Sequence, residues 1–313
     1  MNRIESEEDS LPQGGSVPAI SYHYCGLDRF VRIVKDKTLR LCNLFHMNDS
    51  REVSWFFDIA SKRIEDLLAG PSDGGSGSGS LGWPQNVLAR LSSLIKAARF
   101  YHVYAACFSE DGDSLSQWRG YADDGRGVTL GLDLEEVRKH ANCRLLQRVR
   151  VNYEPGEAEQ RVDAILAPLS AFAASSSSSS SSENGPQPRP AIQFLRQLAR
   201  EAPGFKNPAF KHEREVRLVV RTPVPPDEDL DPSCFDGRWF DGFPFPKDPI
   251  WFCQGRSGFA PYARVGFPAS AVRKVGFGPK FGGYANEVAL TLFCRKKFPG
   301  CAISFYKSEA SYR

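Results

Sequence analysis

The segment between residues 109 and 127 carries the densest group of side chains that could bind a ligand. Apolar runs at 102–108 (HVYAACF) and 127–134 (GVTLGLDL) bracket it, and such short runs bounded by turn signals are typical of buried strands. The candidate binding residues within the segment are Ser116, Trp118, Arg119 and Tyr121. Aromatic rings can stack on a planar ligand, and a guanidinium group matches phosphate oxygens. Because loops held by strands often carry binding groups, we interpret the segment as the wall of a ligand site.

A purely structural role for the same segment stays open from the sequence. In that interpretation the segment only connects two strands of a hairpin, Trp118 covers the core, and Arg119 pairs with Asp123 or Asp124. The residue types alone do not separate the two interpretations.

A second group of charged residues lies in the run HEREVRLVV at 212–220. If this run is a strand, its side chains alternate, so that Glu213, Glu215 and Arg217 share one face and the apolar residues face the core. Two carboxylates at this spacing stand roughly 7 Å apart, close enough to act on one substrate and to shift each other's pKa. The alternative is a solvated strand face with cross-strand ion pairs.

The run SYHYCG at 21–26 places a histidine between two tyrosines in an expected strand. His23 and Tyr24 would face opposite sides of that strand. An isolated histidine in an apolar strand is often a structural residue, so a catalytic role for His23 is one of two alternatives.

The elements that must position these groups are short strands that alternate with single helices. Strands are predicted at 19–24, 39–44, 102–108, 127–134, 144–154, 212–220, 249–254, 262–267, 272–278 and 302–308. Helices are predicted from residue 27 up to the second strand and at 52–68, 86–100, 134–141, 157–174, 191–202 and 284–298. Asn48 and Asp49 suit a turn, with Asp49 or Ser50 as the cap of the helix that follows.

This order of elements predicts one α+β domain at 18–313, with a mixed or antiparallel split sheet and flanking helices. Residues 1–17 are predicted to be disordered, and the segments 70–82 and 174–190 to be flexible insertions, because they contain too few apolar residues to offset their ordering entropy.

The composition limits the classes of function. Across 313 residues, 40 basic and 37 acidic side chains give a net charge of +3, too small to predict a nucleic-acid surface from overall charge, although local basic patches stay possible. The eight cysteines are scattered without a Cys-x-x-Cys pair, which favours a reducing compartment and argues against structural zinc. No signal peptide and no run of about 18 apolar residues is present, so we expect a cytoplasmic protein without membrane contact. The histidines and cysteines do not have the spacing of metal ligands, so no metal site is expected.

A series of motifs in one order resembles a large bacterial family that is known as a domain of unknown function. In this chain the motifs are Tyr22-His23-Tyr24-Cys25, Asn48-Asp49 with Glu52, Cys107-Phe108-Ser109-Glu110, Ser116 with Trp118 and Tyr121, Glu213-x-Glu215-x-Arg217, Gly278-Pro279-Lys280, and a closing Tyr306-Lys307-Ser308 with Tyr312-Arg313. The family's usual threonine is Cys25 here, which weakens any role for a hydroxyl group at that position.

A more distant resemblance is to ADP-ribosyltransferases, which build a split mixed sheet around NAD. These enzymes carry an Arg or His on the first strand, a Ser or Tyr on the second, and a Glu on a later strand, often within Glu-x-Glu. His23, the strand at 39–44 and Glu213-x-Glu215 follow that order, although no Ser or Tyr falls clearly on the second strand.

This resemblance implies roles for individual residues, with NAD as the substrate. Glu215 would stabilise an oxocarbenium-like ribosyl transition state, and Glu213 would position or deprotonate the acceptor. His23 would contact the adenosine ribose, and Arg119 would meet the pyrophosphate. The other residues implied to bind NAD are Tyr22, Tyr24, Asn48, Asp49, Ser116, Trp118, Tyr121 and Arg217.

The expected function is therefore that of an NAD-dependent ADP-ribosyltransferase, or an NAD glycohydrolase, acting as a bacterial toxin or phage-defence effector on an unknown macromolecular acceptor, protein or nucleic acid. The alternative is a non-enzymatic module that senses a nucleotide or binds a partner in phage defence. A nuclease or simple nucleic-acid binder ranks third, because the acidic pairs lack a metal-site arrangement and the net charge is small.

Overall fold

A computed structural model describes residues 19–44, 54–69, 85–97, 103–141, 143, 146–176, 189–221, 251–255 and 258–312. Its strands are β1 Ser21–Cys25, β2 Thr38–Asn43, β3 Val103–Ser109, β4 Val128–Leu132, β5 Gln147–Arg150, β6 Glu215–Arg221, β7 Trp251–Gly255, β8 Gly258–Gly266, β9 Val272–Phe277 and β10 Ser304–Lys307. Its α-helices are α1 Leu27–Asp36, α2 Ser54–Ala69, α3 Gln85–Ala97, α4 Leu115–Tyr121, α5 Leu134–Ala141, α6 Pro155–Ser176, α7 Arg189–Glu201 and α8 Gly283–Lys297. Short 3₁₀ helices are η3 Ala202–Gly204, η4 Pro208–Glu213 and η7 Ala269–Ala271.

All the described strands belong to one mixed sheet. The strand order is β10-β9-β4-β1-β3-β2-β8-β7, with β6 also paired to β3 and β5 paired to β6. Strands β9 and β10 are parallel, and the other pairs are antiparallel. The predicted α+β class with a mixed sheet and flanking helices is therefore confirmed.

The sheet forks at one edge of β3. Strand β6 pairs with the whole of β3, from Val103 to Ser109, and so occupies one edge of it. The opposite edge is shared, because β2 pairs there with Tyr104 and Ala105 whereas β1 pairs with Ser109. Strands β1 and β2 therefore pair with opposite ends of the same edge of β3, and each continues into a different part of the sheet.

One face of the sheet, the apolar face, packs against α1, α5 and α8. Alternate residues of β3, β4 and β6 point to it and form a continuous core with these helices. In α1 the buried residues are Phe30, Ile33 and Val34, whereas the apolar residues Leu27 and Val31 stay exposed. The helix ends where Lys37 adopts a left-handed conformation, with φ of 50°.

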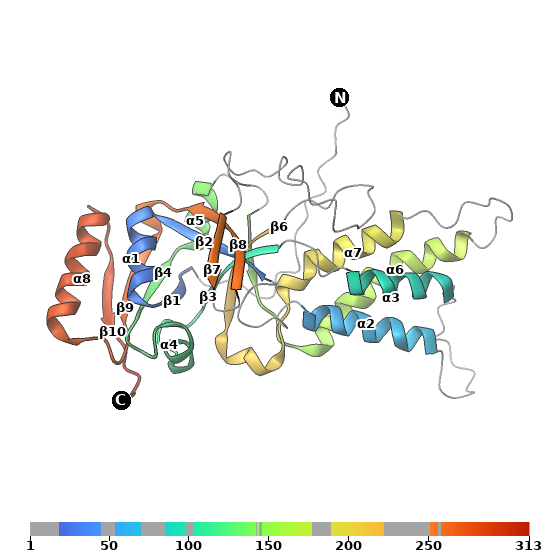
Figure 1. The fold of residues 1–313 in the computed structure, drawn as a ribbon, viewed down its shortest axis with the longest axis horizontal. Helices are drawn as coiled ribbons and strands as arrows, with labels where there is room; N and C mark the ends of the chain where they lie inside the picture. Colours follow the sequence, from blue (N-terminus) through green and yellow to red (C-terminus); the bar gives the residue numbers. More distant parts are fainter. Residues whose placement is uncertain are drawn as a thin grey trace, which may run out of the picture.

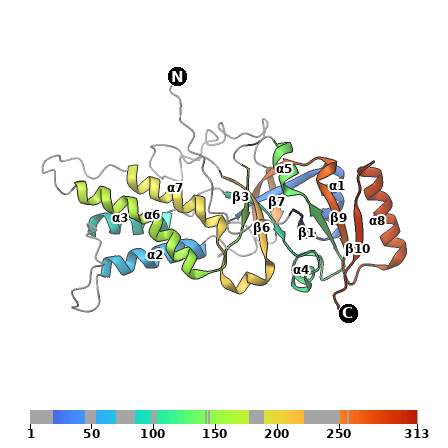
Figure 2. The ribbon, with the colours of Figure 1, turned by 180° about the vertical axis from the view of Figure 1, so that it is seen from behind.

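The other face, the site face, has two separate covers. At one end α4 presses Trp118 against Tyr24. At the other end α2, α3, α6 and α7 pack together and cover the side chains of Val103, Ala105 and Val219. Figures 1 and 2 show these four helices side by side at the end of the molecule opposite α8. Between the two covers, the site face carries polar residues.

Three local features differ from the sequence prediction or lie beyond it. The segment at 109–127, interpreted as a loop, contains α4, which is followed by consecutive left-handed residues at Asp123, Asp124 and Gly125. The strand predicted at 144–154 is described only at 147–150. Most of the predicted insertions and all of residues 1–17 lie outside the described residues, although α6 extends to Ser176 and α7 begins at Arg189.

Candidate active site

The two glutamates of the Glu-x-Glu motif come from different elements. Strand β6 starts at Glu215, whereas Glu213 is the last residue of η4. Arg214 between them is left-handed, with φ of 45°, and this turn breaks the alternation expected of a continuous strand. The prediction of one strand through both glutamates was therefore wrong, but the turn brings both carboxylates to the same lysine.

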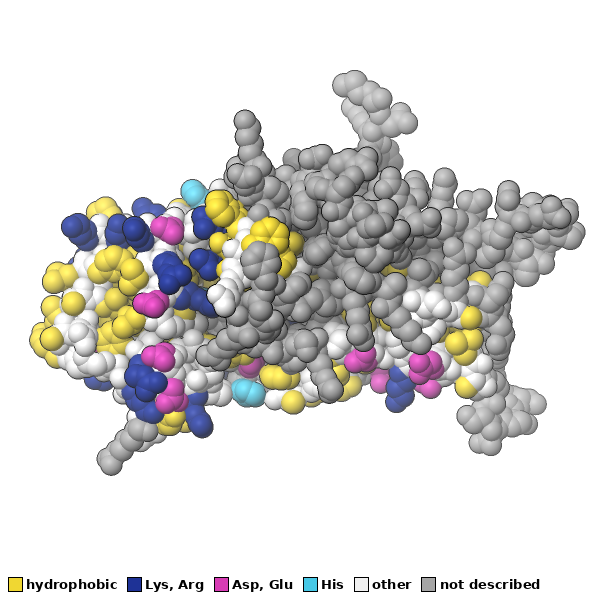
Figure 3. Space-filling model, in the orientation of Figure 1, with side chains coloured by type: hydrophobic (Ala, Val, Ile, Leu, Met, Phe, Trp, Pro, Cys, Tyr) yellow, Lys and Arg dark blue, Asp and Glu magenta, His cyan; other side chains and the backbone are white. Residues whose placement is uncertain are grey.

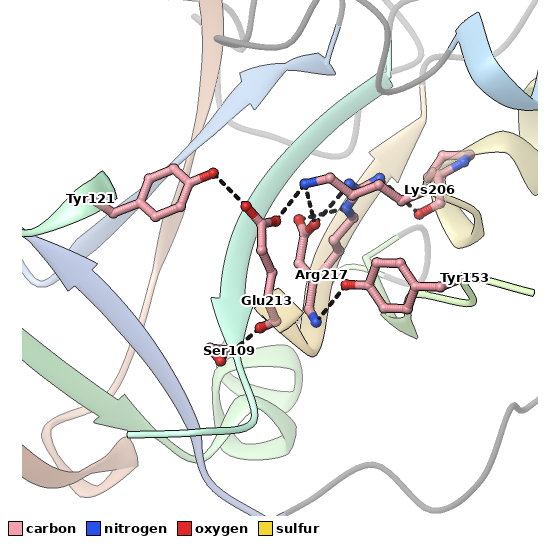
Figure 4. Close-up of polar contacts among 8 residues, drawn as sticks. Ser109, Tyr121, Tyr153, Lys206, Glu213 and Arg217 are labelled. Carbon is pink, nitrogen blue, oxygen red and sulfur yellow. Dashed lines mark hydrogen bonds and ion pairs between the residues drawn. The ribbon is translucent and has the colours of Figure 1, made fainter. Parts of the chain in front are cut away.

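That lysine, Lys206, joins the two glutamates and Arg217 into a buried ion cluster (Figure 4). Lys206 Nζ donates to Glu213 Oε2 at 2.6 Å and to Glu215 Oε2 at 3.1 Å. Arg217 binds Glu215 with two hydrogen bonds, from Nε to Oε1 at 2.7 Å and from Nη2 to Oε2 at 3.0 Å. Its Nη1 donates to the carbonyl oxygen of Pro203 at 3.0 Å.

The cluster is buried and its charges balance. Glu213 is 6% exposed, Glu215 4% and Arg217 0%, so the alternative of a solvated strand face was wrong. Burial by itself would raise the pKa of Glu215, but the cations of Arg217 and Lys206 outweigh burial and hold that pKa well below its usual range. Glu215 is thus a permanent anion at neutral pH, matched by cations on both of its oxygens.

Glu213 differs from Glu215 in what holds its second oxygen. Glu213 Oε1 accepts a hydrogen bond of 2.8 Å from the hydroxyl of Tyr121, which lies at the end of α4 and is 45% exposed. Figure 4 shows Tyr121 approaching Glu213 from the side opposite Lys206. Rotation of one partly exposed tyrosine would uncover Glu213, whereas Glu215 has no comparable route to solvent through its described partners.

Backbone contacts fix the position of both glutamates. Ser109, the last residue of β3, donates from Oγ to the carbonyl oxygen of Glu213 at 2.8 Å. The hydroxyl of Tyr153 accepts a hydrogen bond of 2.9 Å from the backbone N–H of Glu215. The start of β6 is therefore held from β3 on one side and from the segment after β5 on the other.

Three neighbouring strands place polar residues in one row across the site face. Tyr22 of β1 lies opposite Ser109 of β3, which in turn lies opposite Glu215 of β6. Residues directly opposite on antiparallel strands point to the same face. Ser109 is therefore on the strand that lies between β1 and β6 in space.

His23 lies on the apolar side of the sheet, away from this row. Its register partner is Leu130, a residue of the core, and its ring packs at 5.7 Å from that of Phe108. Its Nδ1 lies 3.0 Å from the carbonyl oxygen of Cys107, which can only accept, so Nδ1 carries the hydrogen atom. Burial lowers the pKa of His23 to about 4. The histidine is neutral at pH 7 and satisfies a carbonyl group at the fork of the sheet.

Trp118 of the segment at 109–127 and Tyr24 of β1 both make contacts that hold the fold together. Trp118 is fully buried, and its Nε1 donates to Asp113 Oδ1 at 2.7 Å. The hydroxyl of Tyr24 donates to the carbonyl oxygen of Asp111 at 2.8 Å and accepts from the backbone N–H of Ser114 at 2.9 Å. Neither ring is free to stack on a ligand in this structure.

Arg119 is exposed and has a different partner from the one expected in the structural interpretation. Asp123 pairs with Arg126, and Asp124 pairs with Lys280. Arg119 instead lies over the ring of Tyr312, at 5.4 Å from its centre. Ser116 is also exposed and shares a hydrogen bond of 3.0 Å with Ser114.

The C-terminal motif binds the central segment. Asp113 accepts hydrogen bonds from the hydroxyl of Ser308 and from the backbone N–H of Glu309, besides the one from Trp118. Tyr306 donates to the carbonyl oxygen of Gly112 at 2.7 Å. Motifs almost 200 residues apart in the sequence are thus joined directly.

Sequence reasoning missed Lys206 and Tyr153. Lys206 is the one charged residue in the run APGFKNPAF at 202–210, and a cation placed between two phenylalanines a few residues before Glu213 was the available signal. Tyr153 had no comparable signal. Asn48 and Asp49 lie outside the described residues.

The described residues contain neither a candidate metal site nor a candidate membrane-spanning helix. No described group of three or more His, Cys, Asp or Glu residues could hold a metal ion. Among the described helices, none combines the length and the apolar character that crossing a membrane requires.

Comparison with known proteins gives one match. A family model described as "Protein of unknown function (DUF2971)" matches residues 117–218. No curated protein matches the chain, and no solved structure does. The matched stretch runs from α4 into β6 and contains Tyr121, Lys206, Glu213, Glu215 and Arg217. Over the residues that build the ion cluster, the chain is therefore similar to a family of proteins whose function is unknown.

Proposed function

We propose that this protein is an NAD-cleaving enzyme of the ADP-ribosyltransferase type, with the Glu213–Tyr121 pair facing the substrate. The observation that carries the proposal is the row of Tyr22, Ser109 and Glu215 across β1, β3 and β6. The ADP-ribosyltransferase resemblance implies a histidine strand, a serine or tyrosine strand and a glutamate strand around NAD. Here β1, β3 and β6, which carry His23, Ser109 and Glu215, are adjacent strands in that spatial order, with His23 on the opposite face of the sheet from Ser109 and Glu215.

The two carboxylates take different roles in this proposal. The negative charge of Glu215 is already balanced by the cations of Arg217 and Lys206. This carboxylate can therefore add little stabilisation to a new positive charge on the substrate. Glu213 shares one cation and is otherwise held by a neutral hydroxyl group. We therefore assign the stabilisation of the ribosyl cation to Glu213, and to Glu215 the role of an anchor that positions Lys206. The stabilising role that the sequence assigned to Glu215 thus passes to Glu213, which also keeps its expected role toward the acceptor.

The reaction is a substitution at C1′ of the ribose next to nicotinamide. The bond from C1′ to the nicotinamide nitrogen breaks, its electron pair leaves with nicotinamide, and positive charge grows on the ribose ring. A carboxylate held close to that ring stabilises the charge more in the transition state than in the ground state. An acceptor hydroxyl then forms the new bond to C1′ and gives its proton to Glu213, from which it passes to water. With water as the acceptor, the product is free ADP-ribose.

Other residues near the cluster suit substrate binding. Arg119 is exposed two positions before Tyr121 and offers a guanidinium group for the pyrophosphate. Tyr22 is partly buried beside Ser109 on the site face. Action as a bacterial toxin or phage-defence effector belongs to the same proposal, since consumption of NAD or modification of a macromolecule would harm a host cell.

A second candidate is a nucleotide-sensing module that binds without cleaving. The observation in its favour is the charge balance of the ion cluster, because a buried set of two acids and two bases can serve structure alone.

Calorimetric titration with NAD, together with an assay of released nicotinamide, separates the two candidates. We expect wild type to bind and cleave NAD, Glu213→Gln to bind but release nicotinamide about a hundredfold more slowly, and Tyr121→Phe to show an intermediate rate. The matched control is Glu135→Gln, which removes a carboxylate from the exposed pair with Arg138. Binding without cleavage in wild type would favour the sensor, and absence of binding would exclude both candidates for NAD.

A further inference from the structure

Two arginines lie directly opposite each other on the site face, on the other side of the fork from the ion cluster. Arg40 of β2 and Arg264 of β8 are register partners, and both side chains are exposed. No carboxylate among the described residues forms an ion pair with either one. Because like charges directly opposite in a sheet are destabilising, this pair lowers the stability of the fold unless an anion lies over it.

Aromatic rings hold both guanidinium groups in place. Arg40 lies 4.7 Å from the centre of the Tyr262 ring, and Arg264 lies 4.0 Å from the centre of the Trp251 ring. Arg264 Nη2 also donates to the Tyr262 hydroxyl at 3.3 Å. Tyr262 is only 4% exposed, so it forms a fixed floor between the two arginines. The cations are therefore oriented before any ligand arrives.

Trp251 adds a surface for stacking. Its side chain belongs to β7, faces the same side as Tyr262 and is 41% exposed. In Figure 3, hydrophobic side chains over the region of β7 and β8 lie next to Lys and Arg side chains. An exposed tryptophan beside cations that have no acidic partner among the described residues suits single-stranded nucleic acid, since phosphates meet the cations and an unpaired base stacks on the ring.

We propose that Arg40, Arg264, Tyr262 and Trp251 form a binding surface for single-stranded nucleic acid, with the two arginines on backbone phosphates and Trp251 under a base. A single strand fits better than a duplex, because stacking on a side chain needs a base that is not paired within a helix. The small net charge of the whole chain concealed this local concentration of positive charge.

The surface also suggests which acceptor the enzyme modifies. Cys42 of β2 lies opposite both Tyr262 and Ala105, and Ala105 lies opposite Val219 of β6, so the arginine pair and the ion cluster are on the same face of the sheet. Ala105 and Val219 lie under α2, α3, α6 and α7, so a nucleic-acid strand bound at the arginine pair would reach the ion cluster only by passing around these helices. The role of nucleic acid as ADP-ribose acceptor rests on the proposed function, whereas the binding surface itself does not.

The test is fluorescence anisotropy with a labelled oligothymidylate of about 12 nucleotides, a length within the usual site size of such surfaces. We expect wild type to bind it more tightly than the corresponding duplex, with an affinity that falls as salt rises. Arg40→Gln and Arg264→Gln should each weaken binding about tenfold and lower the salt dependence, and Trp251→Ala should weaken it about tenfold without changing the salt dependence. Arg295→Gln, which removes one exposed charge from α8, is the matched control and should bind like wild type.

A stability measurement separates a binding role from a structural one. Because each substitution of the arginine pair relieves a repulsion, Arg264→Gln should melt at the same temperature as wild type or higher while binding more weakly. Equal affinity of wild type and both arginine variants for the oligonucleotide would overturn the proposal, as would tighter binding of a polyglutamate peptide. Nicotinamide release without nucleic acid is measured in parallel. Cleavage of NAD without oligonucleotide binding would exclude only the proposed binding surface. Oligonucleotide binding without cleavage of NAD would exclude only the proposed enzymatic function.

Discussion

Tyr121 donates its hydroxyl hydrogen to Glu213 Oε1 at 2.8 Å, and this contact joins a half-exposed side chain of α4 to the buried ion cluster. On the opposite side, Lys206 holds the other oxygen of Glu213 at 2.6 Å. Glu213 is therefore the member of the cluster that a ligand could reach by displacing a single neutral group.

Tyr121→Phe tests that contact with little effect on packing. The phenylalanine keeps the ring and removes the hydrogen bond to Glu213, which contributes about 1 to 2 kcal/mol at most to stability because the ring is half-exposed. We expect a small loss in a urea melt but a clear loss of NAD cleavage or binding. An unchanged activity would show that Tyr121 only closes the surface.

Arg217→Met should be one of the most destabilising substitutions in the chain. It removes the two hydrogen bonds to Glu215 and leaves this buried acid with Lys206 as its one cationic partner among the described residues, at an expected cost of about 3 to 5 kcal/mol in a urea melt. The double variant Arg217→Met with Glu215→Leu removes one charge of each sign and should recover much of the loss. As a control, Arg138→Met breaks an exposed pair with Glu135 and should cost less than about 1 kcal/mol. Equal costs for the two arginines would contradict the buried cluster.

His23 should make the protein sensitive to mild acid. Its folded pKa of about 4 lies below the unfolded value of 6.5, so the unfolded chain binds more protons between these two values. The free energy of unfolding is then fully maintained above pH 6.5 and falls as the pH drops toward 4. Urea melts of wild type and His23→Gln at pH 7 and pH 5 check this, because the variant should lose less stability between the two. A parallel loss in both proteins would mean that His23 is solvated.

A glycine is needed at position 112 because the side chains of Tyr22 and Tyr306 approach it closely, and not because of its backbone φ angle. A Cβ atom at this position would lie 2.6 Å from the Tyr22 ring and 2.8 Å from the Tyr306 hydroxyl. Gly112→Ala should therefore lower the free energy of unfolding by about 1 to 3 kcal/mol. Gly120→Ala, within α4 and with open space around the new atom, should be neutral or stabilising. If the two variants melt alike, the packing of Tyr22 against the central segment is looser than described.

The sequence predicted the elements better than the site. The apolar runs around Phe108 and Leu130 gave buried strands at the expected places, because a short apolar run bounded by turn signals is a local signal. The role of Ser109 could not be predicted, since β3 lies between β1 and β6 only through pairings between residues about 85 and 105 positions apart.

The interruption of the predicted strand at Arg214 could not be predicted from the sequence either. A run of alternating charged and apolar residues predicts a strand through Glu213, and only the left-handed turn, which depends on η4 and Lys206, separates the two glutamates. The opposite orientation of His23 and Tyr24 followed correctly from alternation along β1, but which of the two shares a face with Glu215 needed the register of three strands. Long-range pairing, which no local pattern encodes, decided each of these points.

The rate of nicotinamide release from NAD, measured for wild type, Glu213→Gln and Glu215→Gln after each variant is shown to fold by its thermal melt, tests the central claim most directly. The account predicts release by wild type and a loss of about a hundredfold in Glu213→Gln with NAD affinity retained. In Glu215→Gln it predicts a lowered melting temperature and a smaller loss of rate per folded molecule, because this glutamate acts through Lys206. A stable Glu215→Gln variant without activity, beside a fully active Glu213→Gln variant, would contradict the assignment of the two carboxylates.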